Sequence, residues 1–473
     1  MEKITVENYY EKRAELVKAN SNLLGVVLNE KEKELSDILE KLKREYKESC
    51  GGKVPYNIPV LTDKSLVESD LYKFCSMLPK GADLHVHDMS VLPISELKEV
   101  LKNRDEYYIN TDKKHYDLIT VYEGEKVPEG YMRFRDALES GTVTDEELLY
   151  NWTVLGAEKF GIPVWEYFEE LFCRHAAISN NDPFAVAYYN RAFRYYCEHG
   201  IMHVEIHLLL SDDMDKCASY IKTVRQVYYD VKRDYPYFSV KIIGAGMKAD
   251  SDRLEITKKC YVNSLFAQET IKDESDPDHI TNFVIGFDLI NEEDSSLPLT
   301  SFVDMLLKAH KNYPEMKFYI HGGESLEAQN DNLIDAYLLG VSRVGHGLNL
   351  YRYPDLLERY AKSEICLEVC VISNQTLGYT KDIRNHPAAE YLRRGIAIAL
   401  CSDDPTYQEN EILTDDFFAA AVCWDLNIAD LKQLAINSIT YSGLDTYEKT
   451  KLLKAYRLKW TEFVDKAIEV FKD

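Results

Sequence analysis

Eight short apolar runs after residue 80 constrain the fold of this chain more than any other feature. They are rich in Val, Ile and Leu, which is typical of strands buried on both faces of a parallel sheet. Helical patterns separate most of them, and eight strands alternating with helices predict an α/β fold, a (β/α)8 barrel of the TIM type. The runs cover residues 82–87, 201–210, 238–246, 282–289, 317–324, 342–347, 364–373 and 396–404.

The spacing of the runs also predicts what surrounds the barrel. The gap between the first two runs is far longer than one helix, so we expect a helical insertion after the first strand, at about 95–195. Within it, the Tyr-rich stretch 100–150 has weak periodicity and predicts a long loop with a short helix. From "FFAAAVCWDL" onward, the chain has a helical pattern and should cap the barrel.

The N-terminal part of the chain has a different pattern. Residues 6–47 predict a helix, and Asn29 with Glu32 fits an N-terminal cap. We expect residues 1–50 to form a helical arm and 51–473 to form the barrel domain, with "CGGKVPYNIP" (50–59) as the linker. The arm is either a solvated helix or a dimerisation element, and its apolar stripe consists of Leu35, Ile38, Leu39 and Leu42.

Composition excludes several classes of partner. A formal net charge of −24 argues against nucleic acid and favours a small neutral or cationic ligand. No apolar run approaches the roughly 18 residues of a membrane span. The charged N-terminus has no signal-peptide stretch, so a cytoplasmic location is expected unless the sequence is a processed secreted form. The ten cysteines are scattered without a C-x-x-C pair, which argues against a disulfide framework and against a cysteine-ligated zinc.

Polar residues follow the ends of four of the eight predicted strands. In "GADLHVHDMS", His85 and His87 are two residues apart and therefore point to one side of a strand. Taken one at a time, the histidines could be ordinary polar residues of an exposed strand. The motif "SDDP" could be a helix cap, with Pro405 in the first helical turn. The carboxyl ends of barrel strands meet at one face, however, so we expect these residues to form a single site. The other members are His321, Glu324, His346, Asp403 and Asp404.

These residue types suit a metal-dependent hydrolase. Three neutral imidazoles and one carboxylate are a ligand set for zinc, and we assign one zinc per chain to His85, His87, His321 and Asp403. Zinc lowers the pKa of a bound water to roughly 7, which provides hydroxide at neutral pH. Glu324, His346 and Asp404 remain to orient that water and to move protons.

The motifs that carry these residues resemble those of the adenosine deaminase family. "PKGADLHVHD", "HGGES", "RVGHGLNL", "LEVCVISNQ" and "CSDDP" occur in the family's order, and the likeness is greatest to its growth-factor branch. "ENYYEKRAEL" and "LNEKEKE" resemble the arm through which that branch dimerises. The resemblance implies zinc-dependent hydrolytic deamination of adenosine and 2′-deoxyadenosine by a homodimer.

The family resemblance also implies roles for the residues at matching positions. Glu324 would share a proton with purine N1, while His346 and Asp404 would orient and deprotonate the water. Asp404 would also bind N7, and Gly323 would leave room for the ring. Two further positions would contact the substrate, namely Asp88 at the ribose and Trp165 in the pocket, although plain helix packing remains an alternative for Trp165.

The chain departs from the family pattern in three places. Asn291 stands where relatives have a glycine whose N–H meets purine N3. "KIIGAGMKAD" replaces a stretch with polar residues near the ribose, and the insertion is shorter and lacks a cysteine pair, which leaves the sugar end and any receptor binding open.

Alternatives to a nucleoside deaminase also stay open. A deaminase of an adenine nucleotide could pair the phosphate with Lys248, whereas the carboxylate of Asp88 would repel it. Another metal hydrolase of the amidohydrolase type would need a bridging lysine at a middle strand end, and "FDLINE" and "IIGAG" have none there. A non-catalytic signalling protein on this scaffold would be expected to lack a catalytic residue, yet all seven predicted ligands and proton-handling groups are present.

Overall fold

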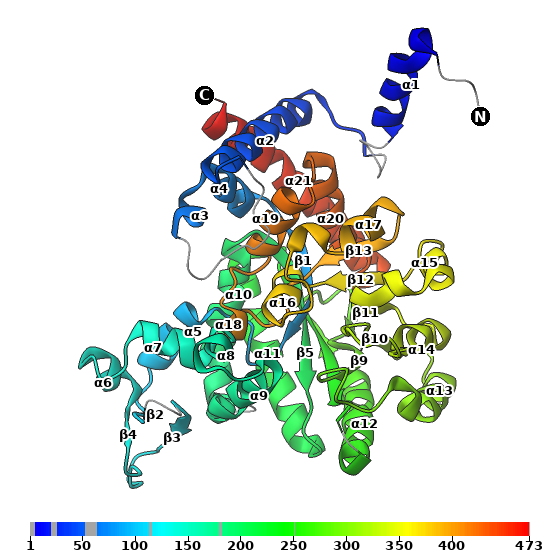
Figure 1. Ribbon diagram of the computed structural model, residues 1–473. Coiled ribbons are helices and arrows are strands. Elements are labelled where there is room, and N and C mark those ends of the chain that lie inside the picture. The colour runs from blue at the N-terminus through cyan, green and yellow to red at the C-terminus, as the bar shows by residue number, and fades with distance from the viewer. Residues whose placement is uncertain are drawn as a thin grey trace.

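Eight parallel strands form a barrel, as the sequence predicts. The computed structural model describes residues 5–19, 26–52, 64–112, 116–178, 182–249 and 251–472. Neighbouring strands pair in the order β1-β5-β6-β9-β10-β11-β12-β13 (Figure 1). Their bounds are β1 Gly81–His87, β5 Ile201–Leu209, β6 Ser239–Met247, β9 Val284–Ile290, β10 Lys317–Gly322, β11 Arg343–His346, β12 Cys366–Val369 and β13 Ala397–Leu400.

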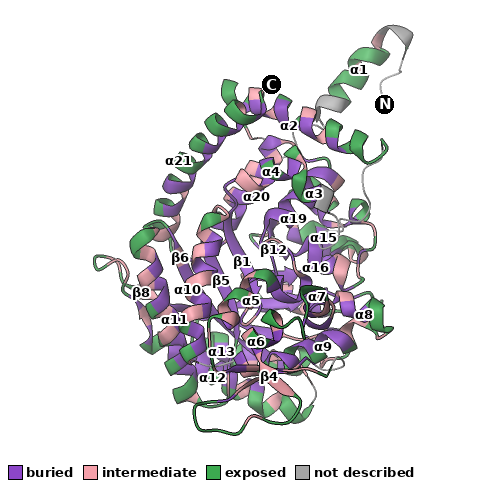
Figure 2. Cartoon of the chain, turned by 90° about the vertical axis from the view of Figure 1, so that its left-hand side faces the viewer, coloured by how far each residue is buried: buried purple, intermediate pink, exposed green. Residues whose placement is uncertain are grey.

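The barrel closes where the end of β13 meets β1. The Asp403 N–H donates to the carbonyl of His85 at 2.9 Å, and the His87 N–H donates to the carbonyl of Asp403 at 3.0 Å. Closure of the barrel therefore brings Asp403 beside the two histidines of β1. The strands are buried along most of their length (Figure 2). One predicted run is too long, because β12 ends at Val369 and the helix α16 (Val371–Thr376) begins two residues later.

Helices surround the barrel, and further helices follow its last strand. The predicted C-terminal helices are present, and α20 packs against β1 and β13. A short hairpin of β7 (Lys272–Asp273) and β8 (Thr281–Asn282) precedes β9. The helices are α11 Met214–Asp234, α12 Leu254–Thr270, α13 Val303–Asn312, α14 Asn332–Leu339, α15 Pro354–Tyr360, α17 Ala388–Arg393, α18 Pro405–Gln408, α19 Thr414–Cys423, α20 Ile428–Thr440 and α21 Thr446–Phe471.

The insertion after β1 contains helices, but its first half differs from the prediction. Where a loop with one short helix was expected, a three-stranded antiparallel sheet forms in the order β3-β2-β4. In "YYIN", buried Tyr107 and Ile109 alternate with half-buried neighbours, which is a strand period that the high polarity of this region obscures. The elements are α5 Ile94–Lys102, β2 Tyr107–Asn110, β3 Leu118–Thr120, β4 Tyr131–Arg133, α6 Phe134–Glu139, α7 Asp145–Trp152, α8 Leu155–Phe160, α9 Val164–Arg174 and α10 Asp182–Glu198.

The N-terminal arm consists of two helices, α1 (Val6–Ala19) and α2 (Glu30–Ser49), rather than the single helix predicted. The predicted cap is the start of the second helix, since Asn29 and Glu32 form a capping box there. The helices α3 (Lys64–Glu68) and α4 (Asp70–Met77) lead to β1. The predicted linker 50–59 lies mostly outside the described residues, which resume at 64.

The apolar stripe of the arm is part of this chain's own core. Its four residues are buried, and α2 packs against α21, α4 and α20. Glu32 fixes this contact, because its buried carboxylate accepts hydrogen bonds from Lys432 and, at 2.7 Å, from Trp460 Nε1. The expectation that the stripe needs a second subunit to cover it is therefore wrong. By contrast, α1 stands apart from the barrel and is mostly exposed (Figures 1 and 2). Among the helices that the structure describes, we find none with the length and apolarity needed to cross a membrane.

Candidate active site

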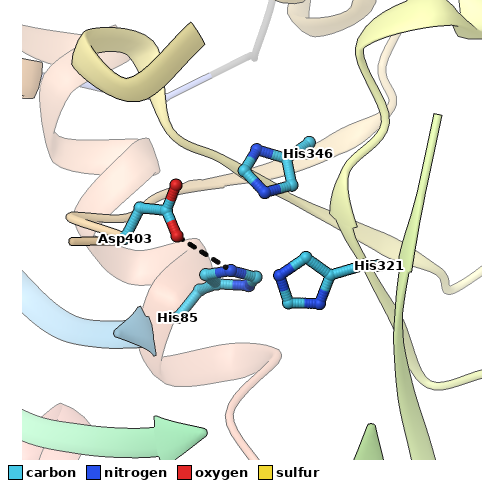
Figure 3. A group of neighbouring side chains, drawn as sticks. All are labelled: His85, His321, His346 and Asp403. Atoms are coloured by element: carbon cyan, nitrogen blue, oxygen red, sulfur yellow. Dashed lines mark ion pairs between the residues drawn. The ribbon is translucent and has the colours of Figure 1, made fainter. Parts of the chain in front are cut away.

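The residues predicted to bind metal converge at the C-terminal ends of the barrel strands, and Figure 3 shows three of them, His85, His321 and Asp403. Asp403 Oδ1 lies 3.5 Å from His85 Nε2 and 3.3 Å from His87 Nε2. The ring centroids of His85 and His321 are 4.4 Å apart, and those of His87 and His321 are 5.2 Å apart. A tetrahedral zinc site with metal–ligand bonds of about 2.0–2.1 Å has its ligand atoms about 3.3 Å apart. The two distances to Asp403 match that spacing.

An orphaned nitrogen supports a metal at this position. His85 is fully buried, and its Nε2 has no hydrogen-bond partner among the described residues. Leaving a buried polar atom unpaired costs about 1–3 kcal/mol, and a cation would remove that cost. The donors therefore fit a metal ion.

His346 is a further imidazole at the cluster. His85, His321, His346 and Asp403 each offer one possible metal-ligating atom, and these four atoms all lie within 4.8 Å of one another. His87 groups instead with Asp403 and Asp404. Asn374 Nδ2 lies 3.2 Å from His346 Nδ1 and, when it donates there, leaves the proton of the neutral ring on Nε2.

Backbone strain gathers around these residues. His346, Asp403 and Asn291 have φ angles of 63°, 61° and 119°, in the region that favours glycine. Such conformations persist where the surrounding structure enforces them, and they cluster at functional sites. Gly345, before His346, is required for space, because a Cβ there would lie 2.9 Å from Cε1 of His85.

Glu324 is the buried acid beside the cluster. Its Oε1 lies 3.5 Å from His346 Nδ1 and has no hydrogen-bond partner among the described residues. Burial and the nearby carboxylates of Asp403 and Glu293 hold the pKa of Glu324 well above its usual range. A raised pKa favours the protonated form of this carboxyl, which is the form that can donate a proton.

Asp404 follows Asp403 in the chain and groups with Asp403 and His87. Burial and the charge of Asp403 raise the pKa of Asp404 to about 7, and Ser90 Oγ donates to its Oδ1 at 2.5 Å. The alternative that "SDDP" is only a helix cap fails for this side chain, because Asp404 makes no side-chain cap to α18. A carboxylate with a pKa near neutrality can accept a proton and release it.

Asp88 and Lys248, the two residues considered for the sugar end, are both buried and have hydrogen-bond partners within the protein. Asp88 is buried, and its Oδ1 accepts hydrogen bonds from the hydroxyls of Tyr189 on α10 and, at 3.2 Å, Tyr220 on α11. Lys248 is fully buried, and its Nζ donates to the carbonyl of His321 at 3.1 Å. This ammonium group therefore supports a strand end at the cluster, and the idea that it pairs with a phosphate loses its main support.

The other three predicted substrate contacts can be explained by interactions within the protein. Trp165 Nε1 donates to the hydroxyl of Tyr379 at 2.9 Å and so joins the insertion to the loop after α16. Asn291 Nδ2 donates to Ser296 Oγ at 3.0 Å, within its own loop. A Cβ at Gly323 would lie 2.7 Å from Asn349 Oδ1 and from Leu333, and its φ is 77°. Packing and backbone conformation thus explain Gly323 without a substrate ring.

Comparison with known proteins places the chain in a family. The sequence model described as Adenosine deaminase matches residues 166–457. The chain belongs to the adenosine deaminase family. Among its relatives, Adenosine deaminase 2-A of Danio rerio is 30% identical over 93% of this chain and 90% of the relative. Adenosine deaminase 2 of Dictyostelium discoideum is 27% identical over 99% of this chain and 89% of the relative.

Solved structures show the same fold at low sequence identity. An amidohydrolase from Burkhoderia ambifaria with bound Zn is 16% identical, with a TM-score of 0.60 over 88% of this chain and 98% of that chain. The N6-methyl-AMP deaminase of Arabidopsis thaliana is 15% identical, with a TM-score of 0.58 over 83% of this chain and 99% of that chain. Both support the barrel architecture for this member of the adenosine deaminase family.

The residues that orient the histidines of this adenosine deaminase family member were not predicted from the sequence. Glu368 Oε2 lies 2.7 Å from His85 Nδ1, and Asp288 Oδ2 lies 2.7 Å from Nδ1 of both His321 and His207. Glu368 thereby directs Nε2 of His85, and Asp288 directs Nε2 of His321, toward the cluster, whereas Nε2 of His207 lies 3.2 Å from the carbonyl of Leu84. Although burial opposes it, the charge of Arg343 lowers the pKa of Glu368 to about 2. The available signal was a charged residue inside an apolar run, in "EICLEVC" and "GFDL".

Proposed function

We propose that this protein hydrolyses adenosine and 2′-deoxyadenosine to the inosine products and ammonia, with one zinc held by His85, His87, His321 and Asp403. The observation that carries the proposal is that Glu324, a buried acid with a raised pKa, lies beside a cluster of predicted metal ligands with an orphaned imidazole nitrogen. Membership of the adenosine deaminase family supports the same reaction.

The chain's own residues have separate tasks in this reaction. Zinc, when bound, would supply hydroxide at neutral pH. Glu324 gives its proton to purine N1, which draws electrons from C6 and prepares it for attack. Asp404 accepts the proton of the attacking water and passes it toward the leaving amine. His346, with its proton on Nε2, donates a hydrogen bond to the oxygen that attacks C6. Water adds and ammonia leaves; as the C6 carbonyl forms, the remaining hydroxyl proton is released and restores the protonated form of Glu324, so no redox partner is needed.

A nucleoside is the proposed substrate because Asp88, which the family resemblance assigns to the ribose, is acidic, whereas the basic Lys248 is bonded to the carbonyl of His321. Asp88 can accept a hydrogen bond from a ribose hydroxyl, whereas its ionised form repels a phosphate by roughly 4 kcal/mol at about 4 Å and an effective dielectric near 20. Burial raises the pKa of Asp88, so the repulsion is weaker than this upper value. The nucleotide alternative remains as the competing outcome.

We expect adenosine and 2′-deoxyadenosine to be deaminated with kcat/KM at least about tenfold above that for AMP, since tenfold corresponds to only about 1.4 kcal/mol of the repulsion. The decrease in ultraviolet absorbance as adenine becomes hypoxanthine measures all three substrates. The Asp88→Asn variant provides the check, because it should reduce the preference against AMP. If AMP is the better substrate for the wild type, the nucleotide alternative replaces this proposal.

We also propose that the protein is a homodimer in which α1 contacts the second copy. The proposal rests on the resemblance of the arm and on the exposure of Tyr9 and Tyr10, which are 49% and 76% exposed. Because α2 belongs to the core, a chain that begins at Asn29 removes α1 and keeps the cap of α2. Sedimentation velocity should then give a dimer for the full chain and a folded monomer for the shortened one. A shortened chain that still sediments as a dimer would show that α1 is not the contact.

A further inference from the structure

Glu293 lies in the loop after β9, and the part assigned to it so far is the charge that helps to raise the pKa of Glu324. Its side chain is buried, and both carboxylate oxygens accept hydrogen bonds from the segment that follows β10. Oε1 accepts from the Gly323 N–H at 3.0 Å and from Asn332 Nδ2 at 2.6 Å. Oε2 accepts from the Glu324 N–H at 2.8 Å. One carboxylate therefore holds two consecutive peptide groups, one of which is the backbone of the acid.

The segment that contains Glu324 needs such external support. The strand β10 ends at Gly322, and residues 323–327 form neither helix nor strand. The Asn349 N–H donates to the Gly323 carbonyl at 2.9 Å, but no strand ladder or helix of the described residues fixes the backbone of Glu324, and Gly323 has a φ of 77°. The next residue is held from the same loop, because Ser325 Oγ donates to Asp294. Side chains of the loop after β9 thus hold the segment that contains Glu324 in place.

We propose that Glu293 is the positioning residue of the acid: its carboxylate fixes the peptide groups of Gly323 and Glu324, and thereby the distance from the Glu324 carboxyl to the purine ring. A general acid works only within about 2.6–3.2 Å of the atom it protonates. A displacement of about 1 Å can cost about a hundredfold in rate. This inference rests on the proposed function, because it assigns Glu293 a part in the same reaction.

The Glu293→Gln variant tests the inference. Gln has nearly the same size, but it replaces one acceptor oxygen by an NH2 group that faces backbone N–H donors. We expect kcat for adenosine to fall about 10- to 100-fold, with KM within about threefold and metal content unchanged. Glu292→Gln is the matched control, because Glu292 is the preceding residue, is only half-buried and accepts from Ser295 in its own loop. It should remain within about twofold of the wild type.

A double-mutant cycle separates positioning from a general structural role. If Glu293 acts through Glu324, adding Glu293→Gln to the Glu324→Gln variant should lower kcat further by less than about twofold. Inhibition by 1-deazaadenosine, which has carbon in place of N1, gives a second measurement. Its Ki should be the same for the wild type and Glu293→Gln, because it cannot accept the proton of Glu324.

The outcomes distinguish this inference from the proposed function. Wild-type turnover in Glu293→Gln would overturn the inference, and so would a loss of the same size in the Glu324→Gln background. Should Glu293→Gln not fold, Glu293→Asp replaces it in the same cycle, since Asp keeps both oxygens but draws them back by one methylene. Failure of the proposed function would appear earlier, as a wild type that does not deaminate adenosine or a Glu324→Gln variant that stays active.

Discussion

The Glu324→Gln variant is expected to keep its metal and lose at least about a hundredfold in kcat for adenosine. An amide has nearly the shape of the carboxyl but no proton to give to N1, and a positioned general acid contributes typically about 10²–10⁴-fold. Glu324 is buried, has an unpartnered Oε1 and keeps a raised pKa, so no solvent or neighbouring group takes over its task.

The measurement combines steady-state kinetics with elemental analysis of the same preparation. Glu327→Gln is the matched control, because Glu327 is an exposed glutamate of the same segment and should remain at wild-type rate. The wild-type rate should fall on the alkaline side, as Glu324 loses its proton when the pH rises through its raised pKa. A near-normal rate in Glu324→Gln with metal bound would remove this residue from the mechanism.

Substitution of His321 by Ala should abolish metal binding and, with it, at least about a thousandfold of the turnover. Changes to the residues that orient metal ligands already cost about 10–100-fold in metal affinity, so loss of a ligand should cost more. The variant also removes the ring that Asp288 orients, whereas His207 Nδ1 and the backbone N–H groups of residues 289 and 321 can remain bonded to Asp288. Zinc per chain, measured after dialysis, is the primary readout and does not depend on activity.

Parallel variants decide which imidazole completes the ligand set. His310→Ala is the control, because His310 is an exposed histidine on α13 and should leave zinc at one per chain. His87→Ala should lose the metal, whereas His346→Ala should retain it and lose turnover. The reverse result would exchange the roles of these two residues. Equal zinc in His321→Ala and the wild type would refute the assignment of His321 as a ligand.

The sequence by itself determined the barrel and most of the candidate site. Apolar runs that alternate with helical patterns report burial on both faces, and this local signal survives without knowledge of contacts. The carboxyl ends of barrel strands must converge, so His85, His87, His321 and His346 could be placed at one face before their distances were known. Asp403 followed from the same rule, and barrel closure brings it beside β1.

Only the tertiary structure decided how these residues are held. Glu368 and Asp288 are separated from their histidine partners by 283 and 33 residues. Nothing in the local sequence reports such pairings, because each depends on which strands become neighbours. The same holds for Lys248, whose ammonium group the sequence left free for a phosphate and the fold turns toward the carbonyl of His321.

Long-range packing also decided which surface covers the apolar stripe of α2. An apolar stripe on a helix predicts that this face is buried, but it does not identify the surface that covers it. Here the covering surface is α21, which lies at the far end of the chain, and Glu32 reaches Trp460 across 428 positions. Hydrophobic periodicity is a local property, whereas the choice of the partner surface is a property of the whole chain.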